Sequence, residues 1–249
     1  MDYGLTGKRA LVLGASRGLG GASATMLAAE GAEVLAASRS GTASGAGVTG
    51  VALDLSDEGS VAAMEARLAA EPVDILVLNS GGPKAGPARG QSAAAWRAAF
   101  EQMAVALFRL TDAALPGMEA AGWGRIVTIG SSGMQAPIPG LALSNGVRGA
   151  VAGWSKTLAS EVAPLGITVN LVLPGRIATD RVAELDGVRA KASGKDVAEI
   201  RAASQATIPA GRYGTPEEFA AAVTFLCSAQ AGYITGTALR VDGGMLRSQ

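Results

Sequence analysis

The first residues that could do chemistry lie in a glycine-rich stretch near the start of the chain. The stretch reads Gly14-Ala15-Ser16-Arg17-Gly18-Leu19-Gly20, which is a G-x-x-x-G-x-G spacing. It follows a short apolar run and precedes a helical pattern. Glycine lets a backbone approach a ligand closely, and the free N–H groups at a helix N-terminus attract phosphate. The stretch therefore predicts a site for the diphosphate of a dinucleotide, although G-x-G-x-x-G is the commoner spacing.

The end of the second apolar run indicates which dinucleotide would bind. An NAD site commonly carries Asp or Glu at this place, where it binds the ribose 2′-hydroxyl. This chain has Ser38-Arg39 there and no acid. Arg39 and Arg17 could hold a 2′-phosphate through charge-assisted hydrogen bonds. We therefore expect NADP(H) rather than NAD(H); the alternative is that both arginines are ordinary surface residues.

Composition excludes several other chemistries. The chain has no histidine, so His-ligated metals, a Ser-His-Asp triad and an imidazole base are excluded. The single cysteine, Cys227, allows neither an internal disulfide nor a Cys-cluster zinc site, and no metal site is expected. Lys and Arg number 21, as do Asp and Glu, so no net charge favours nucleic acid or anionic lipid. Without a long apolar span or a signal peptide, we expect a cytoplasmic protein with no membrane partner.

Short apolar runs alternate with longer helical patterns along the whole chain. Strands are predicted over 9–13, 33–37, 48–53, 75–78, 125–129, 167–173 and 238–241. Helices are predicted over 18–30, 56–71, 92–117, 141–165 and 216–228, the last begun by a capping box of Thr215, Pro216 and Glu218. Several strands are nearly all apolar, which is typical of parallel strands covered on both faces. The pattern predicts one α/β domain over 1–249, a Rossmann-like doubly wound parallel sheet of about seven strands.

Residues 181–212 depart from this alternation because they are charged and mixed. They follow the carboxyl end of the sixth predicted strand, where ligands bind in sheets of this kind. We expect this segment to form a lid over the ligand crevice. The alternative is a solvated helical excursion without a function of its own.

The motifs together resemble the short-chain dehydrogenase/reductase family, and especially its 3-oxoacyl-carrier-protein reductase branch. The glycine turn is similar to the family's T-G-x-x-x-G-x-G, with Leu13 in place of Thr. Further similar motifs, in chain order, are Asp54-Leu55, Asn79-Ser80-Gly81-Gly82, Pro174-Gly175 with Ile177 and Thr179, Tyr233-Ile234-Thr235-Gly236 and Val241-Asp242-Gly243-Gly244. The resemblance covers essentially the whole chain. It implies that Asp54-Leu55 packs by the adenine and that Pro174-Gly175, with Ile177 and Thr179, flanks the nicotinamide. Asn79 and Gly81 are also expected to bind the cofactor, whereas the last two motifs match only the family's C-terminal signature. The resemblance further implies that the two long helices form a homodimer or homotetramer.

The resemblance also implies an active site of Ser, Tyr, Lys and Asn, and here the chain departs from the family. Ser131 takes the Ser position, Ser144 stands where Tyr is expected, and Arg148 stands where Lys is expected. The family's Asn falls on Met103. A serine hydroxyl is a weaker acid than a phenol, and the serine side chain is shorter than that of tyrosine by a whole ring. Arginine does not relay protons as lysine can. Ser131, Ser144 and Arg148 are the candidate catalytic residues; Arg148 could bind the ribose or stabilise an oxyanion, and Ser131 could instead only cap the next turn.

Two functions follow from this combination. The first is an NADP(H)-dependent oxidoreductase with a remodelled site, which transfers hydride to a carbonyl or activated alkene of a small molecule. The second is a catalytically inactive nucleotide-binding pseudoenzyme or a non-catalytic partner subunit. The completeness of the nucleotide motifs favours the first.

Overall fold

The described residues form one sheet of seven strands. The computed structural model describes residues 2–43 and 45–247. The strands are β1 (Arg9–Leu13), β2 (Glu33–Ser38), β3 (Val48–Ala52), β4 (Ile75–Leu78), β5 (Gly124–Ile129), β6 (Ile167–Pro174) and β7 (Ala238–Val241). Their order is β3-β2-β1-β4-β5-β6-β7, and every neighbouring pair is parallel. This confirms the predicted Rossmann-like α/β fold, and the predicted strand bounds are correct to one residue.

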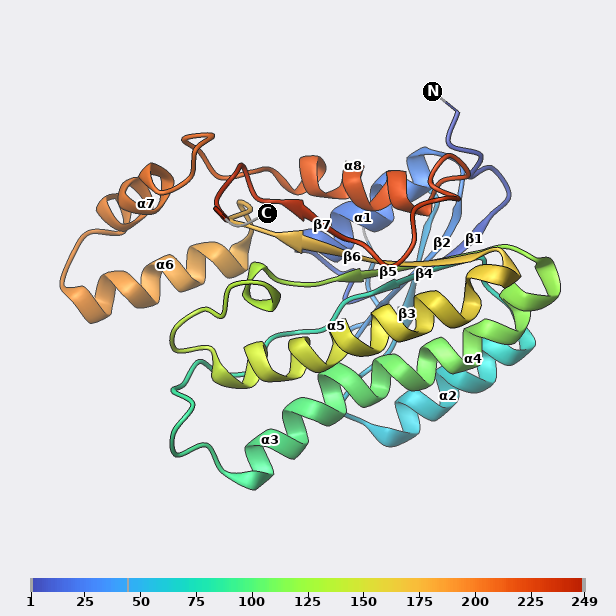
Figure 1. Cartoon of the computed structure of the whole chain (residues 1–249), viewed down its shortest axis with the longest axis horizontal. Helices are drawn as coiled ribbons and strands as arrows, with labels where there is room; N and C mark the ends of the chain where they lie inside the picture. The colour runs from blue at the N-terminus through green and yellow to red at the C-terminus, as the bar shows by residue number, and fades with distance from the viewer. Residues whose placement is uncertain (1, 44, 248–249) are drawn as a thin grey trace.

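Helices cover both faces of the sheet (Figure 1). One face carries α1 (Gly18–Ala29) and α8 (Pro216–Cys227), and the other carries α2 (Glu58–Ala70), α4 (Ala106–Ala121) and α5 (Ala142–Val162). Alternate side chains of a strand point to opposite faces. In β1, accordingly, Leu11 and Leu13 pack in the core on the α2–α4–α5 side, while Val12 packs in the core on the α1–α8 side. No helix of the described chain is both long and apolar enough to cross a membrane.

The helix starts follow local capping chemistry. Thr215 Oγ1 accepts from the Glu218 N–H at 3.2 Å, and Glu218 Oε2 accepts from the Thr215 N–H at 2.8 Å, so the predicted capping box of α8 is confirmed. The predicted start of α2 at Ser56 is wrong by two residues. Asp57 caps that helix by accepting from the Ser60 N–H at 2.7 Å. The Ser56 hydroxyl bonds to Asp54 instead, at 2.6 Å.

The helix predicted over 92–117 differs from the structure in two ways. It consists of α3 (Ala93–Phe100), a π-helical turn over Glu101–Val105, and α4. The π turn directs Met103 into the core that α3 forms with α5, and Met103 is 1% exposed. The predicted end at Gly117 is also wrong, because α4 continues past Pro116 to Ala121 and is capped by Gly122, whose φ is 60°.

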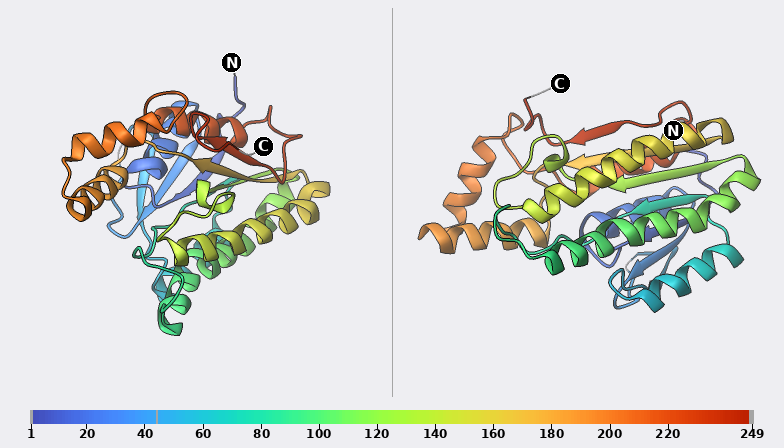
Figure 2. Two further views of the ribbon diagram at one scale, coloured as in Figure 1. Left: turned by 60° about the vertical axis from the view of Figure 1, so that its left-hand side comes forward. Right: turned by 60° about the horizontal axis from the view of Figure 1, so that its bottom comes forward.

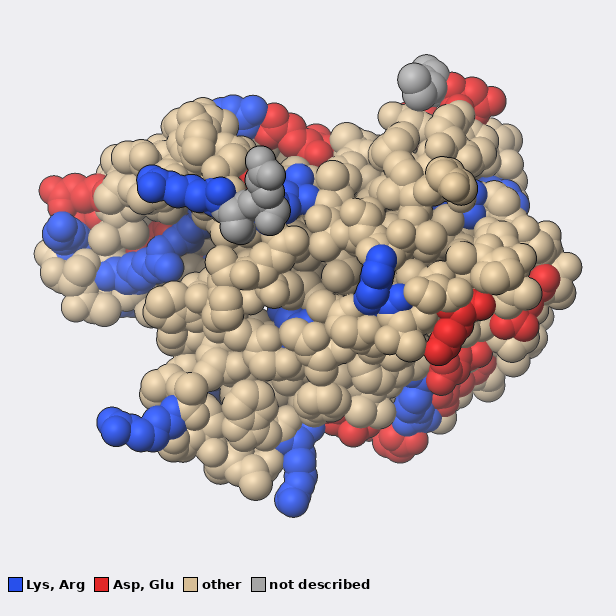
Figure 3. Space-filling view, viewed as in Figure 1, with Lys and Arg blue, Asp and Glu red and all other residues tan. Residues whose placement is uncertain are grey.

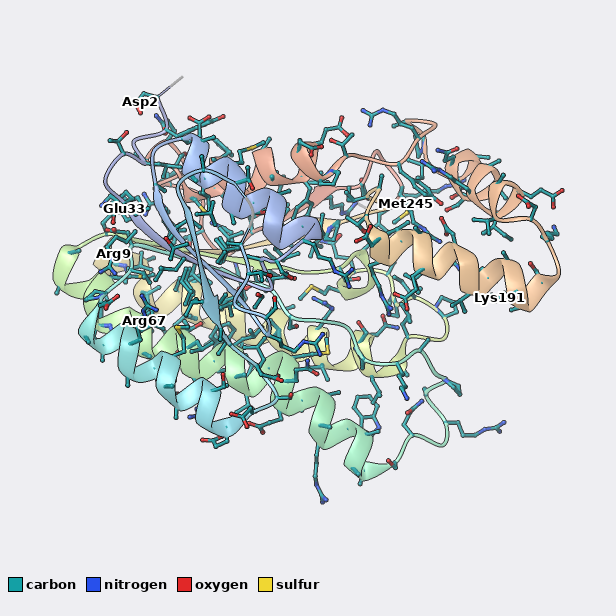
Figure 4. The ribbon with its side chains drawn as sticks, turned by 180° about the vertical axis from the view of Figure 1, so that it is seen from behind. Asp2, Arg9, Glu33, Arg67, Lys191 and Met245 are labelled. Carbon is teal, nitrogen blue, oxygen red and sulfur yellow. The ribbon has the colours of Figure 1, made fainter. Side chains whose placement is uncertain are left out.

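The segment predicted as a lid extends beyond the sheet as two helices (Figure 2). These are α6 (Asp180–Ser193) and α7 (Val197–Ala206). The segment leaves β6 at the carboxyl ends of the strands. Figure 4 shows Lys191 of α6 at this end of the molecule, whereas Arg9, Glu33 and Arg67 lie at the opposite end. The predicted helix over 141–165 comprises α5 followed by a 3-10 turn over Ala163–Leu165.

Candidate active site

The glycine turn between β1 and α1 is tightly packed. Gly14 and Gly18 have φ angles of 60° and 61°, a region that glycine adopts readily. A Cβ on Gly20 would lie 2.5 Å from the Gly14 carbonyl oxygen, so only glycine fits there. Asn79, directly after β4, donates from Nδ2 to the same oxygen at 3.3 Å. The ends of β1 and β4 therefore fix the shape of the turn, at the place where the strand order reverses.

The space in front of this turn suits a phosphate group. Arg17 is the N-cap of α1, and its side chain makes no capping bond to the N–H groups of the first turn. The position that a Cβ would take on Gly18 has one neighbour within 4 Å, the Thr179 methyl at 4.0 Å. A cavity of about 310 Å³ opens beside it, lined by Gly18, Ala22, Ala178, Thr179, Asp180, Pro216 and Glu217. A glycine turn, a helix N-terminus and open space together fit the diphosphate of a dinucleotide.

The two arginines expected at a 2′-phosphate follow adjacent strands, β1 and β2. The Arg39 side chain is exposed and lies near Asp54, after β3. Hydrogen bonds from Ser56 hold the pKa of Asp54 below its usual value, and the charge of Arg39 lowers that pKa further. Arg17 Nη1 forms an ion pair with Asp180 Oδ2 at 3.3 Å, a partner that the sequence did not indicate.

The other predicted cofactor residues lie along the same edge of the sheet. Gly81 follows Asn79, and no atom lies within 4 Å of its Cβ position. Gly175 follows β6, where a Cβ would lie 2.7 Å from the Asp242 Cα. Thr179 caps α6 by accepting from the Val182 N–H at 3.4 Å. The apolar members of this set pack into the hydrophobic cores, Leu19 and Ile177 on the α1–α8 side and Leu55 on the α2 side. Ser16 is half-buried in the glycine turn. Pro174 is the last residue of β6.

Ser131 and the guanidinium of Arg148 both lie at the carboxyl end of β5. Ser131 caps a 3-10 turn, and its Oγ accepts from the Gly133 N–H at 3.1 Å. This bond leaves the hydroxyl proton free to be donated to a ligand. Arg148 Nη1 donates to the carbonyl oxygens of Ile129 at 3.1 Å and Gly130 at 3.3 Å, the two residues before Ser131. Ser144 lies one turn before Arg148 on α5, half-buried and with no hydrogen-bond partner among the described residues.

Arg148 carries its charge in a site that offers no counterion. Its residue surface is partly exposed, but protein atoms crowd the guanidinium, and this burial lowers its pKa to about 10. It remains protonated at neutral pH. No Asp or Glu contributes to the shift, and no ion pair of Arg148 is found in the described chain.

Neither Met103 nor the tyrosines supply the groups that are missing from this site. Met103 is buried against α5 and offers no amide. The Tyr213 hydroxyl donates to Asp186 Oδ2 of α6 at 2.8 Å. Tyr233 is fully exposed. The sequence also did not indicate Asn145, which fixes the loop after Ser131 by bonding both the N–H and the carbonyl of Ile138.

The surface between the lid segment and α3 is hollowed (Figure 3). The turn before α3 belongs to the loop that follows β4, and the hollow opens at the carboxyl ends of the strands. In sheets with a reversed strand order, this is the place where ligands bind. The fold and the site together are those of a dinucleotide-dependent class of protein.

The comparisons with known proteins give the family. The enoyl-(acyl carrier protein) reductase family model matches residues 14–246. The chain is 39% identical over 250 residues to the 3-oxoacyl-[acyl-carrier-protein] reductase of Vibrio cholerae, covering 97% of this chain and 98% of that protein. The L-sorbose reductase of Gluconobacter frateurii, solved with NADPH and L-sorbose, has a TM-score of 0.90 at 31% identity and covers 100% of both chains. YwfH, an NADPH-dependent reductase involved in bacilysin biosynthesis, has a TM-score of 0.88 at 28% identity, covering 97% of this chain and 99% of that chain. The chain belongs to the short-chain dehydrogenase/reductase family, as its motifs predicted.

Proposed function

We propose that this protein is an NADP(H)-dependent oxidoreductase that transfers hydride to a carbonyl or activated alkene of a small molecule. The observation that carries the proposal is the glycine turn at the N-terminus of α1, with Arg17 and Arg39 at the ends of neighbouring strands. The family membership and the NADPH-dependent reductases among the similar structures support it. They also favour the enzyme over the alternative of an inactive nucleotide-binding protein.

The chain's own residues divide the work of binding between two ends of the crevice. The glycine turn holds the diphosphate, while Arg17 and Arg39 bind the 2′-phosphate. Asp54 and Leu55 lie on the adenine side, and the residues after β6 lie on the nicotinamide side. When bound, the nicotinamide supplies or accepts the hydride.

At the reacting centre, Ser131 donates its hydroxyl proton to the substrate oxygen, since its bond with the Gly133 N–H uses the hydroxyl oxygen as acceptor and leaves that proton free. The positive charge of Arg148 stabilises negative charge that develops on that oxygen. Neither Ser144 nor Arg148 is a suitable proton donor at neutral pH, so water supplies the proton. Positioning by the protein then provides much of the rate.

The proposed function also assigns a role to the segment beside this site and to the long helices. The segment 181–212 acts as a lid within a single domain, since α6 and α7 lie at the open end of the crevice. The long helices α4 and α5 form the interface of a homodimer or homotetramer. The protein works in the cytoplasm and needs neither nucleic acid nor membrane.

Thermal-shift titrations with NADPH and NADH test the cofactor assignment. Ligand at a hundredfold excess over Kd stabilises a native site by about 2.7 kcal/mol, which is a shift of a few degrees for a chain of this size. We expect NADPH to bind more tightly, and Arg39→Gln to weaken NADPH binding about tenfold more than NADH binding. Arg67→Gln, which removes the same charge at the opposite end of the molecule, is the control. No shift with either nucleotide would overturn the proposed function.

Measuring NADPH oxidation distinguishes a catalytically active site from one that has lost its activity. We expect the unmodified protein to oxidise NADPH with a carbonyl or enone substrate, and Ser144→Tyr combined with Arg148→Lys to be slower. A double variant that gains carbonyl reductase activity absent from the parent would show instead that the parent site has lost its function.

A further inference from the structure

The guanidinium of Arg148 has one edge in use and one edge free. Nη1 is occupied by the carbonyl oxygens of Ile129 and Gly130. Nε and Nη2 have no partner in the described part of the chain. These two nitrogens form the side-on edge of a guanidinium, which presents two parallel N–H groups. That edge matches the two oxygens of a carboxylate.

The charge of this group also lacks compensation. Carbonyl oxygens at the end of β5 are dipoles and do not neutralise a cation. A charge removed from water without a partner is unfavourable, and protein sites normally relieve this with an opposite charge. Here the crowded guanidinium has no acidic neighbour that affects its pKa. The hydroxyls of a ribose are neutral and would leave the charge uncompensated.

The groups around Arg148 restrict where an anion could sit. Ser131 follows the two carbonyl acceptors directly, and Ser144 lies one turn before Arg148 on the same face of α5. On the other side, the core of α3 and α5 is closed by Met103, Leu143 and Val147, all buried. The two carbonyl acceptors hold the guanidinium at the carboxyl end of β5, next to Ser131 in the chain, so we expect an anion to approach the free edge from that side.

We propose that the free edge of Arg148 binds a carboxylate of the substrate, so that this enzyme acts on small oxo acids or unsaturated acids. This inference rests on the proposed function. Hydride is transferred to the carbonyl carbon, the carbonyl oxygen takes a proton from water, and the nicotinamide is oxidised. The carboxylate keeps its charge throughout and serves to orient the substrate, while Ser131 bonds the reacting oxygen.

Two matched pairs of probes test the inference by binding. Acetoacetate is compared with acetoacetamide, and 2-oxobutanoate with 2-oxobutanamide, because each pair differs chiefly in the carboxylate charge. Kd is measured calorimetrically with the protein saturated with NADP⁺. We expect at least one acid to bind about ten- to a hundredfold more tightly than its amide, since hydrogen bonds to charged groups are about twice as strong as neutral ones.

Variants on α5 identify the residue responsible. Arg148→Gln should abolish the preference for the acid, and Arg148→Lys should keep part of it. Lys156→Gln is the matched control, because Lys156 is exposed on the same helix and bonds the Gly236 carbonyl at 3.0 Å, away from the crevice. Its preference should equal that of the parent.

Two results would overturn the inference: equal binding of acid and amide by the parent in both pairs, or an unchanged preference in Arg148→Gln. The first comparison needs no variant, so it holds even where Arg148→Gln fails to fold. The NADPH titration above is a separate readout. A protein that binds NADPH but shows no acid preference would retain the proposed function and lose only this inference.

Discussion

Arg17 and Asp180 connect the glycine turn to the first residue of α6. Their side chains are each 78% exposed, and the charged atoms lie 3.3 Å apart. An exposed ion pair of this kind contributes about 0.2–1 kcal/mol. The same guanidinium is the proposed ligand of the 2′-phosphate. We therefore expect Asp180 to compete with the 2′-phosphate for Arg17.

We predict that Asp180→Asn raises the affinity for NADPH by up to about fivefold, the equivalent of the lost ion pair. The affinity for NADH should change less, because NADH has no 2′-phosphate. Fluorescence titration measures both values. Glu184→Gln, which removes the exposed partner of Arg181 in the same helix, serves as the control. Weaker NADPH binding by Asp180→Asn would show that Asp180 does not compete for Arg17.

Some residues of the site could be predicted from the sequence because their chemistry is encoded locally. The glycine spacing and the absence of an acid at Arg39 are read within a few positions of the chain. The pair of Arg17 and Asp180 joins residues 163 positions apart, so no local pattern indicates it. The missing counterion of Arg148 is likewise a property of everything packed around it, and only the assembled crevice shows it.

At the scale of elements, the turn between β1 and α1 has no room for a side chain at Gly20. We predict that Gly20→Ala weakens NADPH binding by at least about tenfold, because the added Cβ would lie 2.5 Å from the Gly14 oxygen and the turn must shift. Gly187→Ala in α6, where a Cβ meets nothing within 4 Å, should leave binding unchanged. Calorimetric titration of the two variants decides between a rigid turn and an adaptable one; equal affinities would contradict the prediction.

The lid segment is tied to the sheet by a buried polar network. Asp186 of α6 is 2% exposed and accepts from Arg176 Nη1 at 3.0 Å and from the Tyr213 hydroxyl at 2.8 Å. The guanidinium of Arg201, in α7, lies 5.4 Å from the centre of the Tyr213 ring. The network joins both lid helices to the chain that leaves β6 and to the chain that enters α8.

Tyr213→Phe should destabilise the protein by about 1–3 kcal/mol, because it leaves a buried oxygen of Asp186 without one of its hydrogen bonds. Urea unfolding measures this change. Tyr233→Phe removes a hydroxyl from a fully exposed ring and should alter stability by less than about 0.5 kcal/mol. Similar unfolding midpoints for the two variants would indicate that the network does not stabilise the fold.

The strands were predictable to one residue because several of them are short, nearly all-apolar runs, which are typical of a buried parallel sheet. The break between α3 and α4 could not be predicted from the sequence. A π turn adds one residue without any proline or glycine to mark it, and Glu101–Val105 consists of good helix formers apart from the β-branched Val105. Pro116 and Gly117 predicted a helix end that the structure does not have. Tertiary packing continues α4 through both residues.

At the scale of the whole molecule, the proposed assembly through α4 and α5 can be tested by a substitution on α5. Gly153 of α5 is exposed, and no atom lies within 4 Å of its Cβ position in the single chain. We expect Gly153→Arg to dissociate the oligomer, because a long charged side chain would enter a close helix contact. Ala66→Arg on exposed α2 is the control. Sedimentation equilibrium gives the masses, and an unchanged mass for Gly153→Arg would place the interface elsewhere.

The contact between Asn79 and Gly14 spans 65 positions, and the parts of the crevice on the nicotinamide side lie still later in the chain, after β5 and β6. A ribosome releases the glycine turn long before the strands that complete its surroundings. A nascent chain that ends before β4 has the turn but not the amide that fixes its shape. We therefore expect the cofactor to bind only after the sheet has assembled. Bound cofactor would then stabilise only the assembled sheet. Adding NADPH to a refolding reaction should therefore slow unfolding without speeding the formation of the native state.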